Sequence, residues 1–168
     1  TTPEIMSLIA DEYAMVTGAL APAVITGKPL ERGGSKGRGV ATGYGGFYVL
    51  EELAKQLKLK SQSTTIAIQG FGNAGTYFAQ IASRAGYRIV AACDSRSGVI
   101  DLSDKGMDVD MLMKRKSQDG DLSGVIASDL KRYKVIDTKK ILEAKVDILV
   151  PAALENQLTK ENAGRVKA

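Results

Sequence analysis

Gly70-Phe71-Gly72-Asn73-Ala74-Gly75 is the stretch that decides the fold, because of what stands on either side of it. The run Thr64–Gln69 (TTIAIQ) before it and the run Arg88–Asp94 (RIVAACD) after it are short and rich in apolar and β-branched residues, which predicts two buried strands. Between them, apolar residues at helical spacing over 77–82 predict a helix that ends at Gly86. A strand, a glycine turn, a helix and a second strand within about thirty residues predict a βαβ unit and therefore a parallel sheet.

The same six residues match G-x-G-x-x-G, the glycine pattern of dinucleotide-binding folds. In that pattern Gly70 permits a tight turn, Gly72 lets the backbone approach a pyrophosphate, and Gly75 lets the helix pack close to the strand. The helix N-terminus adds unpaired N–H groups and a partial positive charge. Because the pattern follows an expected strand and opens an expected helix, we expect a nucleotide site here. Ordinary turn glycines in a parallel α/β protein are the alternative.

Asp94, at the end of the second expected strand, indicates which dinucleotide is bound. A carboxylate there accepts hydrogen bonds from the adenine ribose hydroxyls and repels a 2′-phosphate. We therefore expect NAD as the cofactor. Ser95 and Arg96 follow directly, and a hydroxyl and a guanidinium beside the same ribose suit a 2′-phosphate, so NADP stays open as an alternative.

The composition excludes several other chemistries. With no histidine among 168 residues, the chain has no Ser-His-Asp or Cys-His system and no H-E-x-x-H zinc site. The single Cys93 provides neither a disulfide framework nor a thiolate cage, so we expect no metal. Lys and Arg number 23 against 19 Asp and Glu, but the signs alternate and aromatic residues are few, so we expect no nucleic-acid partner. No apolar run reaches the ~18 residues of a membrane helix, and no signal-peptide pattern is present, so we expect no membrane contact and a cytoplasmic location.

Apolar periodicity assigns the rest of the chain. Apolar residues three and four apart predict helices, and the short run VDILV predicts a third buried strand. The helices are expected over 4–17, 42–57, 108–116, 137–144 and 159–166, and the third strand over 146–150. We expect an α/β fold, a Rossmann-type parallel sheet with helices on both faces, truncated at its C-terminal side. Residues 1–60 are expected to form a helical, glycine-rich cleft segment and residues 61–168 the Rossmann core, within one structural domain.

Several motifs of the chain recur, in the same order, in glutamate dehydrogenases. They are TGKP at 26–29, GGS at 33–35, Arg38, ATGYG at 41–45, GFGNAG at 70–75, ACDS at 92–95 and VPAALENQ at 150–157. On these motifs the chain resembles the NAD-binding domain of the glutamate dehydrogenases, within the Glu/Leu/Phe/Val dehydrogenase family, over essentially its whole length. Leucine and phenylalanine dehydrogenases share the architecture but differ after G-K-P, so another amino-acid dehydrogenase is the second choice.

The resemblance implies roles for individual residues. The hydroxyl of Thr42 is expected to hold the nicotinamide carboxamide, Asn156 to bond the same end of the cofactor, and Arg38 to lie at the cleft. A helix cap for Thr42 and a solvated loop position for Arg38 are the alternatives. The run Lys114–Lys116 is expected to be a solvated helix end. The cofactor-binding residues expected are Arg38, Thr42, Gly70, Phe71, Gly72, Asn73, Ala74, Gly75, Asp94, Ser95, Ala152 and Asn156.

The resemblance also implies an activity, the oxidative deamination of L-glutamate to 2-oxoglutarate and ammonium with hydride transfer to NAD(P). The family's catalytic lysine stands in a G-G-x-K-G-G segment and acts with an aspartate, both on a preceding substrate domain, and Lys28 in G-K-P is not that lysine. We expect no catalytic residue in this chain, which is interpreted as an excised or truncated, inactive cofactor domain. Its parent is expected to be a homohexamer and the fragment a monomer or weak dimer. A stand-alone NAD-binding or regulatory module without catalysis is the alternative.

Overall fold

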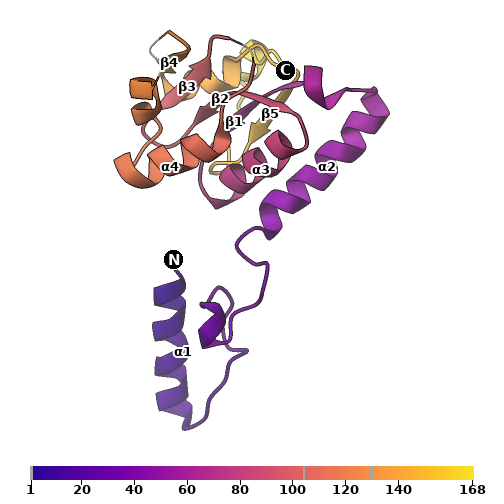
Figure 1. Cartoon of the computed structure of the whole chain (residues 1–168). Helices are drawn as coiled ribbons and strands as arrows, with labels where there is room; N and C mark the ends of the chain where they lie inside the picture. Colours follow the sequence, from indigo (N-terminus) through magenta and orange to yellow (C-terminus); the bar gives the residue numbers. More distant parts are fainter. Residues whose placement is uncertain (1, 104, 129–130) are drawn as a thin grey trace. The chain divides into compact units, whose positions relative to one another are not determined.

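The computed structural model describes residues 2–103, 105–128 and 131–168, and its packing divides the chain into two compact units (Figure 1). The first unit is Thr1–Ala41 and the second is Thr42–Ala168. The boundary expected near residue 60 falls inside the second unit. Helix α2 (Ala41–Leu57) explains this, because its Leu50 and Ala54 are buried in the same core as the sheet.

The first unit contains helix α1 (Pro3–Thr17), which confirms the helix predicted over 4–17. The side chain of Thr2 caps the helix by accepting a hydrogen bond from the backbone N–H of Ile5, and Pro3 opens the first turn. Gly18 ends the helix with a left-handed φ of 71°, and its N–H donates to the carbonyl of Ala14.

The glycine-rich loop after α1 is stabilised by its own backbone. The ammonium of Lys28 is buried and donates to the carbonyl oxygens of Pro22, at 2.8 Å, and of Ile25. A Cβ on Gly34 would lie 2.0 Å from the carbonyl oxygen of Lys28, so the chain crosses itself closely there. The short 3₁₀-helix η1 (Leu30–Arg32) lies between these two contacts in the sequence.

The second unit is built on a five-stranded sheet of order β4-β3-β2-β1-β5. Its strands are β1 (Thr65–Gln69), β2 (Arg88–Cys93), β3 (Gly98–Asp101), β4 (Tyr133–Ile136) and β5 (Ile148–Pro151). Strand β1 pairs in parallel with both β2 and β5, which confirms the predicted α/β class and its parallel centre. Strands β3 and β4 add an antiparallel edge that the sequence analysis did not predict. The connection from β2 to β3 is too short for a crossover, so β3 has to return antiparallel.

The two faces of the sheet are covered differently. Ile66 and Ile68 of β1 point into a core shared with the helices α2, α3 (Asn73–Arg84) and α4 (Val109–Asp119). Ala67, between them, points to the other face and packs against the 3₁₀-helix η4 (Thr138–Glu143). The remaining 3₁₀-helices are η2 (Ser61–Ser63), η3 (Ser123–Ser128) and η5 (Ala163–Arg165). None of the helices in the described part of the chain is long and apolar enough to cross a membrane.

Two predicted α-helices have a different form in the structure. The segment predicted over 137–144 is the 3₁₀-helix η4, which still buries Ile141 and Leu142. The segment predicted over 159–166 contains only turns and η5, because Asn162 binds the local backbone instead. Its side chain accepts from the N–H of Thr159 at 2.8 Å and donates to the carbonyl of Gln157 at 2.7 Å. Such local side-chain bonds compete with a helix.

Candidate functional site

A cleft opens at the carboxyl ends of the parallel strands. The chain passes from β1 through α3 to β2 on one side, while β5 lies on the other side of β1, so the strand order reverses at β1. In doubly wound sheets ligands bind at this switch point. The cleft has a volume of about 520 Å³. It is lined by Gln69, Gly70, Phe71, Gly72, Cys93, Asp94, Ser95, Lys116, Thr138, Ala152, Ala153, Leu154 and Gln157.

The glycine turn after β1 forms one wall of this cleft, and its three glycines differ in their surroundings. Gly70 has a φ of 92°, and a Cβ there would lie 2.6 Å from the carbonyl oxygen of Ala152. A Cβ on Gly75 would lie 1.9 Å from the carbonyl oxygen of Gly70, which confirms the close helix-to-strand packing predicted for Gly75. A Cβ on Gly72 would meet no atom within 4 Å. Gly70 and Gly75 are therefore needed for the close packing of the turn, whereas Gly72 leaves its backbone uncovered beside open space.

Helix α3 begins directly after this bare backbone. Gly72 is its N-cap residue and has no side chain to cap the helix, so no N-cap side chain accepts from the N–H groups at the start of the first turn. Gly72 and Asn73 also line a smaller hollow of about 360 Å³, which shares Phe71 and Lys116 with the cleft. Free N–H groups and the helix dipole at such a place favour an anion.

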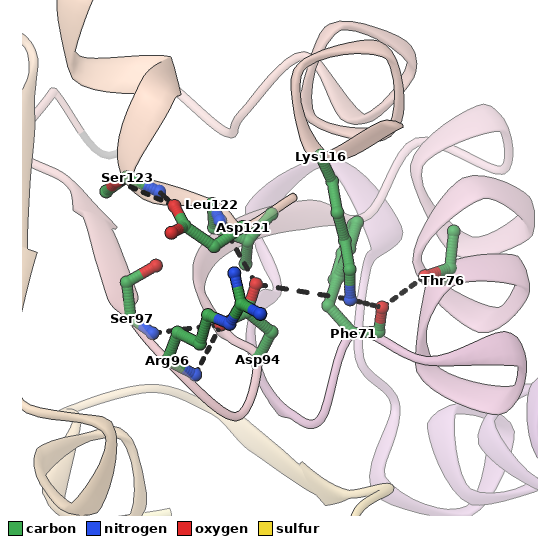
Figure 2. Close-up of polar contacts among 9 residues, drawn as sticks. All are labelled: Phe71, Thr76, Asp94, Arg96, Ser97, Lys116, Asp121, Leu122 and Ser123. Atoms are coloured by element: carbon green, nitrogen blue, oxygen red, sulfur yellow. Dashed lines mark hydrogen bonds and ion pairs between the residues drawn. The ribbon is translucent and has the colours of Figure 1, made fainter. Parts of the chain in front are cut away.

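The carboxylate of Asp94 lines the same cleft at the end of β2 and is held by backbone N–H groups (Figure 2). Its Oδ1 accepts from the N–H of Arg96 at 2.8 Å and of Ser97 at 2.9 Å. Its Oδ2 accepts from the N–H of Leu122 at 3.0 Å. The side chain is only 5% exposed. Asp94 thus joins the β2–β3 turn to the loop after α4, a structural role in addition to the expected ribose contact, which stays a prediction.

Lys116 reaches into the cleft from α4 (Figure 2). Its Nζ donates to the carbonyl oxygen of Phe71 and lies 4.0 Å from Oδ2 of Asp94 and 5.8 Å from the centre of the Phe71 ring. The expectation that Lys114–Lys116 is a solvated helix end is therefore wrong for Lys116. A signal was available, because the apolar Leu112 stands four residues earlier and residues four apart share one helix face.

The cleft also contains polar residues that were not among the expected site residues. Gln69, the last residue of β1, is 7% exposed and donates from Nε2 to Oε1 of Gln157 at 2.6 Å. Cys93, the last residue of β2, is buried, and this burial raises the pKa of its thiol. Thr138 lines the cleft from η4. Gln69 and Cys93 could have been expected at the site, because each is at the carboxyl end of an expected parallel strand.

The structure brings together most of the expected cofactor-binding residues. Those that line the cleft are Gly70, Phe71, Gly72, Asp94, Ser95 and Ala152, and Asn73 lines the adjoining hollow. Ala74 and Gly75 lie in the first turn of α3. Asn156 lies in the loop after β5, next to the cleft residue Gln157, with a left-handed φ of 56°.

The other two expected residues, Thr42 and Arg38, belong to the start of α2 and to the turn before it. Thr42 is exposed inside the first turn of α2, beside Gly43, whose Cβ would lie 2.8 Å from the backbone N of Phe78 in α3. Arg38 belongs to the first unit, where it is exposed in the turn before α2. Within the described residues, no group of three His, Cys, Asp or Glu side chains is placed to hold a metal ion.

Comparison with known proteins agrees with this arrangement. The family model for glutamate/leucine/phenylalanine/valine dehydrogenase matches residues 33–168. The NADP-specific glutamate dehydrogenase of Synechocystis sp. is 37% identical over 100% of this chain and 40% of its own length. The cryptic catabolic NAD-specific glutamate dehydrogenase of Bacillus subtilis is 38% identical over 100% of this chain and 38% of its own length. The hetero-hexameric glutamate dehydrogenase of Thermus thermophilus, in its Leu-bound form, is 33% identical over 99% of this chain and 38% of its own, with a TM-score of 0.85.

The chain thus spans about two fifths of the length of these relatives (40% and 38%). The match to the family model covers residues 33–168, which is more than half of the chain. The chain therefore belongs to the glutamate/leucine/phenylalanine/valine dehydrogenase family.

Proposed function

We propose that the chain is the nicotinamide-cofactor-binding domain of a glutamate dehydrogenase. The observation that carries the proposal is the pairing of bare backbone at Gly72 with the uncapped start of α3, at the point where the strand order reverses. This combination suits a pyrophosphate. The substrate, L-glutamate or 2-oxoglutarate, is inferred from the names of the relatives.

The residues of the cleft fit the parts of a dinucleotide. The backbone at Gly72 and Asn73 would hold the pyrophosphate, the end of β2 with Asp94 and Ser95 would receive the adenosine half, and the loop after β5 would receive the nicotinamide half. When bound, the nicotinamide ring supplies the acceptor for the hydride that leaves the amino acid. The chain itself would bind and orient the cofactor and exclude water from one side of it.

We propose that NAD is the preferred cofactor and that NADP also binds. Relatives of both specificities match the whole chain. The Asp94 carboxylate opposes a 2′-phosphate, but the Lys116 ammonium lies 4.0 Å from it and offsets much of its charge. A preference of less than about tenfold for NAD is therefore expected.

The residues that act on glutamate would lie outside this chain. The chain covers only 40% of the Synechocystis relative, and its sequence contains no G-G-x-K-G-G segment. We therefore expect the isolated chain to bind the cofactor without oxidising glutamate. Because the Thermus relative is hetero-hexameric, we also propose a hexamer for the whole protein, whereas the isolated chain would be a monomer or weak dimer.

The experiment that tests the proposal is a calorimetric titration of the isolated chain with NAD⁺, NADP⁺ and ADP-ribose. Gly72→Val is the informative variant, because Gly72 has a φ of −85° that any residue adopts and open space around it. The valine should leave the thermal unfolding midpoint unchanged. Its side chain should block the pyrophosphate and lower the affinity tenfold or more, which is on the order of one lost charge-assisted hydrogen bond. The proposal fails if the wild-type chain binds none of the three ligands, or if Gly72→Val binds them unchanged.

A further inference from the structure

The carboxyl end of β1 and the loop after β5 are joined by two amide side chains. Nε2 of Gln69 donates to Oε1 of Gln157 at 2.6 Å. Beside this pair, the backbone N–H of Ala152 donates to the carbonyl oxygen of Gln69 at 2.7 Å. The loop of residues 152–157 is therefore fastened to β1 near its start and at its end.

Neighbouring bonds fix the orientation of both amides. Nε2 of Gln157 donates to the carbonyl oxygen of Glu155 at 3.1 Å, so its Oε1 is turned toward Gln69. The NH₂ group of Gln69 must then face Gln157, and Oε1 of Gln69 is left over. This oxygen is buried and receives no hydrogen bond from any residue that the structure describes. A buried amide oxygen without a donor is disfavoured, so the network is one donor short.

The pair lies in the half of the cleft that the proposed function gives to the nicotinamide. Gln69 and Gln157 both line the cleft where β5 follows β1 in the sheet, whereas Asp94 lines it at the end of β2. Asn156, directly before Gln157, has a left-handed φ of 56°, a conformation that asparagine tolerates better than most residues and that turns the loop at this point. The amide of Gln157 then joins the end of this loop to Glu155 and Gln69.

We propose that Gln69 and Gln157 are positioning residues for the nicotinamide half of the cofactor, and this inference rests on the proposed dinucleotide function. Their amide pair holds the 152–157 loop against the end of β1, in the form that receives this half. The adenosine and pyrophosphate parts contact the other side of the cleft and do not depend on the pair.

The test compares two ligands that differ only in the nicotinamide, NAD⁺ and ADP-ribose, on the isolated chain. The variants are Gln157→Leu, in the loop, Gln69→Leu, in the strand, and the double variant. Gln80→Leu is the matched control, because Gln80 lies on α3 and donates to Asp110 at 2.7 Å outside the cleft. Thermal unfolding of each variant verifies that it is folded, and Gln157, in a partly exposed loop, provides a test that leaves the core intact.

Each single variant is expected to weaken NAD⁺ binding about tenfold and to change ADP-ribose binding by less than about twofold. The double variant should bind NAD⁺ no more weakly than the poorer single variant, because the two side chains act as one pair. Three outcomes would overturn the inference: equal losses of affinity for both ligands, no loss of affinity for NAD⁺, or additive losses in the double variant. In each case, binding by the wild-type chain would still support the proposed function. A wild-type chain that binds neither ligand overturns both.

Discussion

A Cβ atom on Gly75 would lie 1.9 Å from the carbonyl oxygen of Gly70, so the first turn of α3 rests directly on the end of β1. The nearest atoms belong to the backbone of Gly70, which cannot move aside as the end of a long side chain could. We predict that Gly75→Ala destabilises the second unit by about 3 kcal/mol or more, at the upper end of the cost of overpacking. Denaturant unfolding measures the loss.

Gly45→Ala is the control for this substitution, because Gly45 lies inside α2 and a Cβ there meets no atom within 4 Å. Alanine is a better helix former than glycine, so a gain of about 0.5–1 kcal/mol is expected. Equal effects of the two substitutions would contradict the packing role of Gly75.

Asp94→Asn tests the structural role of the buried carboxylate. The carboxylate accepts three backbone N–H bonds, from Arg96, Ser97 and Leu122, and an amide replaces one of its two accepting oxygens by a donor. We predict a loss of stability of about 1–3 kcal/mol. Asp121→Asn is the control, because Asp121 makes a similar local turn with Ser123 on the exposed side of the loop and should cost under about 1 kcal/mol. A fully stable Asp94→Asn variant would rule out the role.

Lys116→Met tests whether the Lys116 ammonium contributes to binding the 2′-phosphate of NADP⁺. The substitution keeps the apolar stem over Phe71 and removes the charge beside Asp94. NADP⁺ affinity is predicted to fall about tenfold and NAD⁺ affinity less than about threefold, because only NADP⁺ carries the extra phosphate. Lys114→Met, an exposed position on the same helix, should change neither. Titrations of both variants with NAD⁺ and NADP⁺ at one salt concentration measure these affinities. An equal loss of affinity for both cofactors would place the Lys116 charge near the pyrophosphate instead.

The ion pair of Asp101 and Arg132 is expected to make the stability of the fold depend on pH in the acid range. Asp101 has a fully buried side chain, and burial alone would raise its pKa. Hydrogen bonds from Arg132, at 3.1 and 3.2 Å, and from Ser103 outweigh burial, so the pKa of Asp101 is lowered. A lowered pKa in the folded state means stability that is present above the unfolded pKa of about 4 and is lost as the pH falls through the folded value.

Asp101→Asn should therefore reduce the free energy of unfolding at pH 7 by about 2–4 kcal/mol and flatten the fall of this free energy as the pH drops below about 4. Urea unfolding across that range measures both effects. Asp137→Asn, at an exposed cap that accepts from the N–H of Lys139, serves as the control with a small effect at neutral pH. An unchanged acid slope in Asp101→Asn would refute the assignment.

The parts of the fold that depend on local periodicity could be predicted from the sequence. Helices α1 and α2 and strands β1, β2 and β5 lie within a residue or two of their predicted ranges, because each has a regular apolar pattern and clear end residues. Strand β4 (YKVI) could not be predicted, because its two middle residues are exposed and only its pairing with β3 makes it a strand.

The parts of the candidate site that depend on backbone geometry, as at Gly70 and Gly75, could be predicted from the sequence. The long side chains that enter the cleft from other elements were harder to predict. Lys116 and Gln157 enter the cleft from elements far along the chain. For Lys116 the local sequence gives only the helix face, through the apolar Leu112 four residues earlier, and for Gln157 it gives no direction. The packing of α4 and of the loop after β5 sets where the two side chains point. Of the three hydrogen bonds to Asp94, the one from Leu122 also depends on tertiary packing, whereas those from Arg96 and Ser97 are local to the β2–β3 turn.

The close approach of Gly43 to Phe78 has a mechanical consequence. It sets how closely the first turn of α2 approaches α3, the helix that starts at the glycine turn. Any side chain at position 43 would have to push the two helices apart, so their spacing at this point depends on the absence of a Cβ atom.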